Sequence, residues 1–71
     1  MDRDTVGSTM IASIGYEPSS GTVEAEFRSN GQIWQYYDVP ETTYYELRAA
    51  SSLGRAFNAM IKGKFREARI G

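Results

Sequence analysis

Neither cysteine nor histidine occurs anywhere in this 71-residue chain. A domain of this size buries only about 60% of its unfolded surface, so it usually needs disulfides, a metal or a partner copy to be stable. Disulfides are excluded, and a structural zinc site is excluded in practice because no thiolate or imidazole is available. The chain must therefore rely on a dense apolar core rich in aromatic side chains, on oligomerisation, or on both.

The same two absences limit catalysis, because histidine and cysteine are the commonest general bases and nucleophiles. Ser51 or Ser52 could pair with Lys62, but that lysine lies near the opposite end of a predicted helix about 15 Å long. Glu24 and Glu26 form a carboxylate pair about 7 Å apart along one predicted strand. Both face solvent on a flat surface, so we expect them to keep that face of the sheet hydrated. We therefore expect a protein that is not an enzyme and that binds no cofactor and no metal.

Residues 10–28 predict a first β-hairpin. Met10–Tyr16 reads as a strand with Ala12, Ile14 and Tyr16 on one face. The segment 17–21 is a turn, in which a proline fixes φ and a glycine can take a positive φ. Thr22–Arg28 has the clearest alternation in the chain, with apolar residues on one face and charged residues on the other. This pattern indicates an antiparallel sheet with one buried and one solvated face.

The next strand is predicted over Gln32–Val39. Asn30-Gly31 precedes it and favours a two-residue type I′ turn, which needs positive φ at both positions. Two facings are open for this strand, because aromatic residues alternate in both registers. We favour Trp34 and Tyr36 inward, because the other facing would bury Gln35.

Two helices follow Pro40, which suits the first position of a helix. The first is predicted over Glu41–Ala50 and the second over Leu53–Lys62, with Ser52 as N-cap and Gly63 as C-cap. Apolar residues of the second helix recur at i, i+3, i+4, i+7 and i+8, as an amphipathic helix requires. The sequence thus predicts an α+β fold, a three-stranded antiparallel meander followed by two α-helices and a short basic C-terminal segment. We expect one domain over residues 1–71, with a core from 6 to 66 and loose flanking ends.

Charge is divided unevenly along the chain. Residues 1–47 carry eight acidic and two basic side chains, whereas residues 48–71 carry six basic and one acidic. The net charge of −1 therefore conceals a basic C-terminal third, which could attract an anionic partner. An ordinary solvated surface would also carry some charge, and this explanation stays open.

The candidate binding site lies on the polar face of the second predicted helix and on the tail. Four of the residues around it, Ser51, Arg55, Asn58 and Lys62, fall within about 60° of one another on a helical projection. Arginine can grip phosphate in a bidentate manner and lysine as a point charge. A polar outer face is also what any amphipathic helix presents. The candidate binding residues are Ser52, Arg55, Asn58, Lys62, Lys64, Arg66 and Arg69.

Aromatic residues of the third strand offer a second way to contact nucleic acid. Trp34, Tyr36 and Tyr37 could stack on unpaired bases, as aromatic side chains on open sheets do. The same residues are the obvious core material of a small domain, and we favour the core for them. Tyr37 is the exception, because it points to the other face.

Taken together, the linear motifs resemble the KTSC domain, which takes its name from its occurrence at the C-terminus of some lysyl-tRNA synthetases. The resemblance covers about residues 6–66, with Ala56 and Trp34 as departures from the residues usual in the family. It implies a small stand-alone module, common in bacterial and phage proteins, without an established activity. The motifs are Ser8-Thr9-Met10-Ile11, Ile14-Gly15-Tyr16, Val23 to Phe27, Asn30-Gly31, Trp34-Gln35-Tyr36, Asp38-Val39-Pro40, Tyr44-x-x-Leu47, Ala50-Ser51-Ser52-x-Gly54-Arg55-x-Phe57-Asn58 and Ile61-Lys62-Gly63-Lys64-Phe65.

These observations favour a non-catalytic binding module for a phosphate-bearing partner, which could be RNA, DNA or a nucleotide-like ligand. The sequence pI near 5.3 makes a nucleotide-sized ligand as credible as a long polymer. The alternative is a protein–protein interaction module, such as a bacterial or phage protein that binds and blocks or scaffolds another protein. Homo-oligomerisation is compatible with both. No apolar run approaches the ~20 residues of a membrane span, and the N-terminus lacks the layout of a signal peptide, so we expect a cytoplasmic protein.

Overall fold

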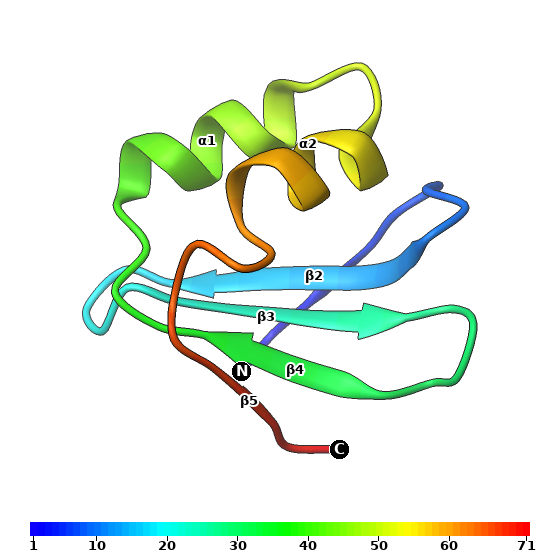
Figure 1. The fold of residues 1–71 in the computed structure, drawn as a ribbon, viewed down its shortest axis with the longest axis horizontal. Coiled ribbons are helices and arrows are strands. Elements are labelled where there is room, and N and C mark those ends of the chain that lie inside the picture. Colours follow the sequence, from blue (N-terminus) through cyan, green and yellow to red (C-terminus); the bar gives the residue numbers. More distant parts are fainter.

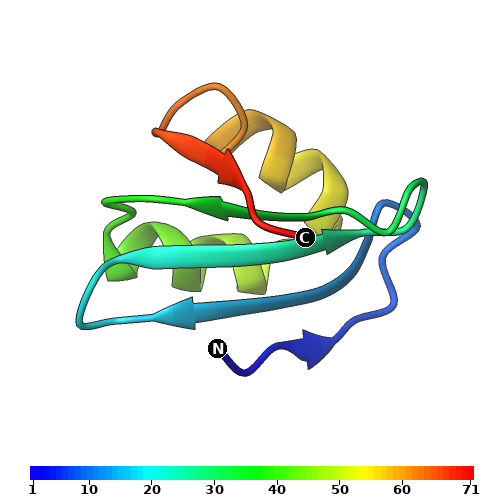
Figure 2. The same ribbon diagram turned by 90° about the horizontal axis from the view of Figure 1, so that it is seen from below.

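The computed structural model describes all 71 residues as one five-stranded antiparallel sheet with two helices on one face (Figure 1). The strands are ordered β1-β2-β3-β4-β5 across the sheet, and Figure 2 shows β1 and β5 at its two edges. The α+β class, the antiparallel meander and the two following helices are as predicted. In chain order the elements are β1 (Asp4–Thr5), β2 (Ile11–Glu17), β3 (Thr22–Phe27), β4 (Ile33–Tyr36), α1 (Glu41–Ala49), α2 (Leu53–Met60) and β5 (Glu67–Arg69).

Both ends of the chain join the sheet as short strands that periodicity does not predict. Asp4 pairs with Ile14, which places β1 beside β2. At the opposite edge, Glu67 pairs with Tyr36 and Arg69 with Trp34. The basic C-terminal segment is therefore extended and hydrogen-bonded to β4, and it closes the meander on the side away from β1.

One irregularity in β2 changes which residue enters the core. The pairing between β2 and β3 shifts between Ile11 and Ser13, which is a β-bulge. Ile11 is consequently fully buried, whereas Ala12 is only half-buried. The prediction that Ala12 shares a face with Ile14 and Tyr16 takes no account of this bulge, because simple alternation cannot register one.

The hairpin between β3 and β4 exists as predicted, but its turn is different. Gly31 has a φ of 70°, whereas Asn30 stays in the negative-φ region. The Gly31 amide donates to the Phe27 carbonyl at 2.9 Å, so the loop spans residues 28–31 and is not a two-residue type I′ turn. The predicted facing of the next strand is confirmed, since Trp34 lies opposite Ala25 and Tyr36 opposite Val23 on the core face.

The core lies between the sheet and the helices and is centred on Phe57 of α2. The ring of Phe57 makes edge-to-face contacts with Tyr36 and Phe27, at centroid distances of 5.1 and 5.7 Å. From α1, Tyr44 stacks on Tyr16 at 4.7 Å. The apolar stripe of α2 thus packs inward as predicted. The fully or largely buried core residues are Ile11, Ile14, Val23, Ala25, Tyr36, Val39, Tyr44, Leu47, Phe57 and Ile61.

The start of α2 follows the predicted capping, but its end does not, because the C-cap is Ile61 and not Gly63. The Ser52 hydroxyl accepts a hydrogen bond from the Arg55 amide at 3.4 Å, so the predicted N-cap is confirmed. The helix ends at Met60, two residues before the predicted end. Gly63 takes a φ of 76° just beyond it, a conformation that glycine adopts without steric penalty.

The second face of the sheet is less solvated than predicted. Glu24 is only 4% exposed, because Arg3 from the N-terminal segment covers it and pairs with its carboxylate. Gln35 donates a second hydrogen bond to Glu24 at 2.8 Å. Burial alone would raise the pKa of Glu24, but the hydrogen bonds from Gln35 and Arg3 and the charge of Arg3 outweigh it, so the pKa is lowered.

Candidate functional site

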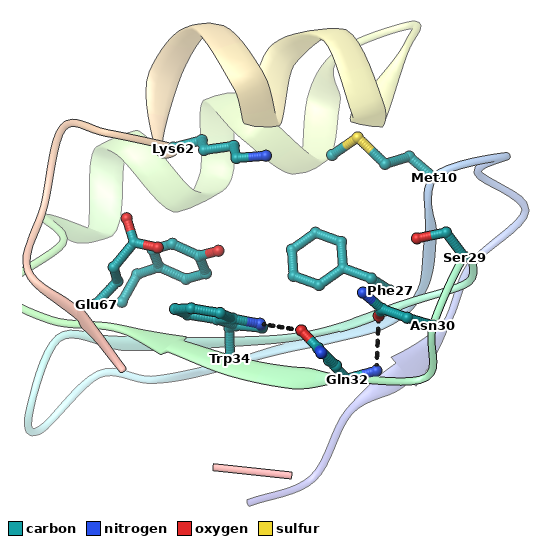
Figure 3. Close-up of a pocket in the computed structure, with 9 residues that line it drawn as sticks. Met10, Phe27, Ser29, Asn30, Gln32, Trp34, Lys62 and Glu67 are labelled. Atoms are coloured by element: carbon teal, nitrogen blue, oxygen red, sulfur yellow. Dashed lines mark hydrogen bonds between the residues drawn. The ribbon is translucent and has the colours of Figure 1, made fainter. Parts of the chain in front are cut away.

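A groove of about 420 Å³ opens between the C-terminal end of α2, the strands β4 and β5, and the loop between β3 and β4 (Figure 3). This volume lies within the range of roughly 300–1,000 Å³ that is typical of small-ligand sites. Apolar side chains form the floor and the back wall, and polar side chains stand around the opening. The lining residues are Met10, Phe27, Ser29, Asn30, Gln32, Trp34, Tyr36, Lys62 and Glu67.

Trp34 forms the floor of the groove. It comes from β4, on the same face as Tyr36, and it is only half-buried although it packs against the core. Its indole N–H donates to the side-chain oxygen of Gln32 at 3.1 Å. One face of the indole is thus turned toward the groove (Figure 3). The sequence-based preference for the core describes only part of its environment.

Amide groups of the loop after β3 form one end of the groove. The side-chain oxygen of Asn30 accepts from the Gln32 backbone N–H at 2.9 Å, which fixes the loop, and Gln32 is held by Trp34. The oxygen atoms of both side chains are therefore engaged. Their amide nitrogens make no hydrogen bond within the protein and remain as donors.

Opposite charges stand at the other two sides of the groove. Lys62, just beyond α2, reaches over the groove from the side facing Trp34, and Glu67 of β5 stands at the end away from the loop (Figure 3). Neither side chain has an ion-pair or hydrogen-bond partner in the protein. Burial, and secondly the negative charge of Glu67, raise the pKa of Tyr36 to about 12, so that phenol stays neutral.

The structure does not gather all seven predicted site residues at one place. Ser52 caps α2, so its hydroxyl is engaged in the helix. Arg55, Asn58 and Lys64 are exposed on α2 and the following turn, and Lys62 enters the groove. The remaining two, Arg66 and Arg69, both make hydrogen bonds within the protein.

Arg66 lies away from the groove. Its guanidinium pairs with Asp38 at 3.1 Å and lies over the ring of Tyr37 at 5.5 Å. Tyr37 donates to Gln35, which places this cluster toward the opposite face of the sheet. Arg69 is different, because its pairing with Trp34 places it on the groove side of β5, although its Nε donates to the carbonyl of Gly71 at 2.8 Å.

The ion pairs of the protein show which cations remain free. The structure contains three, which involve Arg3, Arg48 and Arg66. The other five cations have no carboxylate partner. Arg28 and Arg69 donate to backbone carbonyls, whereas Arg55, Lys62 and Lys64, which belong to α2 or the turn that follows it, make no side-chain hydrogen bond. The cations without any side-chain partner therefore all lie on α2 or the turn that follows it, and of these Lys62 lines the groove.

Sequence reasoning missed most of the groove. Glu67 enters it only because β5 pairs with β4, and nothing in its local sequence signals that pairing. The Asn30-Gly31 dipeptide predicts a turn, but a predicted turn does not show that the loop borders a cavity. No group of three acidic side chains is placed to hold a metal ion, and neither helix is long and apolar enough to cross a membrane.

Comparisons with known proteins all relate this chain to one small domain. A sequence model of the KTSC domain matches residues 7–65. The crystal structure of a KTSC domain protein from Yersinia pestis is similar with a TM-score of 0.93 and 43% identity, covering 99% of this chain and 97% of that one. An uncharacterized protein from Stutzerimonas stutzeri is 39% identical over 87% of this chain and 86% of its own length. A lysine–tRNA ligase from a Nostoc species is 41% identical over 82% of this chain, which spans only 10% of the ligase.

Proposed function

The chain belongs to the KTSC domain family, and we propose that it is a non-catalytic binding module for an anionic, phosphate-bearing partner. The observation that carries this proposal is the set of three unpaired cations, Arg55, Lys62 and Lys64, on α2 and the turn beside an open groove. RNA, DNA and nucleotide-like ligands all carry the phosphate that these cations would neutralise.

The surroundings of these cations strengthen their attraction for anions. No acidic residue occurs between Glu46 and Glu67, so α2 carries no carboxylate of its own. Lysine ammonium groups act as point charges toward phosphate, and an arginine can bind it with two parallel hydrogen bonds. Like charges that are left unpaired on one surface raise the local concentration of anions and speed their association.

RNA is the first partner to test. The likeness to part of a lysine–tRNA ligase supports this choice, although it concerns a tenth of that enzyme. Short single-stranded RNA and its duplex, each with a fluorescent label, would be titrated by anisotropy at low and at moderate salt. We expect binding that weakens as salt rises, because each phosphate contact releases counterions.

A charge-matched pair of variants separates the proposed surface from net charge. Lys62→Ala with Lys64→Ala removes two unpaired cations, and Arg48→Ala with Arg66→Ala removes two cations that already have acidic partners. Both double variants have the same net charge. The first should weaken binding several-fold more than the second. Equal affinities would contradict the proposal, and absence of binding to RNA, duplex and nucleotides at low salt would favour a protein partner.

A further inference from the structure

We propose that the groove binds one unpaired guanine base, stacked on Trp34, with Glu67 at its Watson–Crick edge and its phosphate beside Lys62. This inference rests on the proposed function and names its ligand. A stacking floor, a carboxylate, amide donors and a cation line one groove, and each has a different counterpart on a guanine nucleotide.

Trp34 supplies the stacking platform. Unpaired bases bind proteins by stacking on aromatic side chains, and this contact alone does not distinguish among bases. The Trp34 indole forms the groove floor, and the space above it separates it from Lys62 (Figure 3). A base lying on the indole would leave its sugar and phosphate near that ammonium group.

Glu67 selects the base. An ionised carboxylate can only accept hydrogen bonds. Guanine alone presents two adjacent donors, N1–H and the N2 amino group, on its Watson–Crick edge. Adenine and cytosine each place an acceptor beside their donor, and uracil flanks one donor with two acceptors. A single carboxylate therefore pairs fully only with guanine, and Glu67 has no competing partner in the protein.

The loop amides complement the other edge of the same base. N7 and O6 of guanine are both acceptors. The amide nitrogens of Asn30 and Gln32 are free donors at the end of the groove away from Glu67, because their oxygen atoms are already engaged. Acceptors at one end and donors at the other match guanine and oppose adenine, whose amino group would face the amide donors.

Lys62 argues against a cationic ligand. An aromatic floor with a carboxylate would otherwise suit an organic cation, which such surroundings attract. The ammonium group of Lys62 lines the same groove and would repel it. A ligand that carries both a stacking ring and a negative charge satisfies all of these groups.

The chain contains a single tryptophan, so its fluorescence reports directly on the groove floor. Guanosine, adenosine, cytidine and uridine 5′-monophosphates would be titrated against the intact protein. We expect guanosine monophosphate to quench Trp34 and to bind roughly tenfold or more tightly than adenosine monophosphate, as a bidentate base contact does. A short RNA with one unpaired guanosine should outcompete the free nucleotide if the groove serves RNA.

Two variants test the assigned roles. Glu67→Gln should remove the preference for guanine while the protein keeps its thermal stability, because this side chain is exposed. Lys62→Ala should weaken all four nucleotides by a similar factor. Equal binding of the four nucleotides by the unaltered protein, or an unchanged preference in Glu67→Gln, would overturn the guanine assignment. Salt-sensitive RNA binding without base preference would overturn it and leave the proposed function standing, whereas no RNA or nucleotide binding would overturn both.

Discussion

The guanidinium of Arg3 pairs with the carboxylate of Glu24 across the full width of β2. Arg3 precedes β1, and Glu24 lies on β3, so the side chain spans the intervening strand. On its way it donates from Nε to the hydroxyl of Ser13 at 2.9 Å. The N-terminal segment is thereby fastened to the polar face of the sheet, and the residues before β2 form part of the folded domain.

Replacement of Arg3 by alanine should lower the free energy of unfolding by roughly 1–3 kcal/mol, because it leaves a buried carboxylate with one donor fewer. Chemical denaturation measures this change. Arg66→Ala is the matched control, since both partners of its ion pair are 77% exposed and such pairs contribute about 0–1 kcal/mol. Equal losses in the two variants would show that the Arg3–Glu24 pair has no special role.

Glu24 should make the protein sensitive to acid. Its pKa in the folded state is lowered below the ordinary value of 4.5, so the unfolded state takes up the proton first as pH falls. The stabilisation is fully present above pH 4.5 and is lost as pH falls through the folded-state pKa. Denaturation at a series of acidic pH values should show a shallower decline for Glu24→Gln than for the unaltered protein. Parallel curves would mean that other carboxylates cause the acid sensitivity.

Tyr36 should produce the opposite dependence at alkaline pH. Its folded-state pKa of about 12 exceeds the value of about 10 expected after unfolding. The stabilisation is therefore complete below pH 10 and is lost as pH rises through 12, to an extent of roughly 2–3 kcal/mol. Tyr36→Phe should flatten the stability profile over this window, and an unchanged profile would argue against a buried neutral phenol.

Gly15 should not tolerate a side chain. An added Cβ would overlap the backbone oxygen of Asp2, which cannot move without displacing β1. We expect Gly15→Ala to destabilise the protein by roughly 1–3 kcal/mol and to speed hydrogen exchange at Val6, whose amide donates to the Ala12 carbonyl at 3.1 Å. Gly7→Ala is the control, because a Cβ there meets nothing within 4 Å, and its stability should stay equal or rise slightly.

Periodicity predicts those strands and helices whose own sequence carries an apolar face that the fold buries. The strands around Val23 and Trp34 and the helix around Phe57 each carry such a face, so their existence and facing follow from the sequence. Strands β1 and β5 are two and three residues long and mostly polar. They exist because distant strands offer backbone partners, which no local pattern records.

The candidate site likewise contains residues that the sequence predicts and residues that it does not. Lys62 is predicted as a binding residue because it belongs to the polar side of an amphipathic helix. Trp34 and Glu67 are 33 positions apart in the chain and meet at the groove only through the pairing of β4 with β5. Charge and composition thus predict the sign of the charge on the proposed ligand. The shape of the groove, in contrast, depends on tertiary structure.

The most direct test of the proposed function is the salt dependence of binding to a short single-stranded RNA. If the three unpaired cations Arg55, Lys62 and Lys64 each neutralise one phosphate, the logarithm of the association constant should fall linearly with the logarithm of salt concentration. The slope should be about −2, since each phosphate contributes about −0.7 on a single strand. Binding with a slope near zero, or no binding at low salt, would contradict the assignment of this surface to a phosphate-bearing partner.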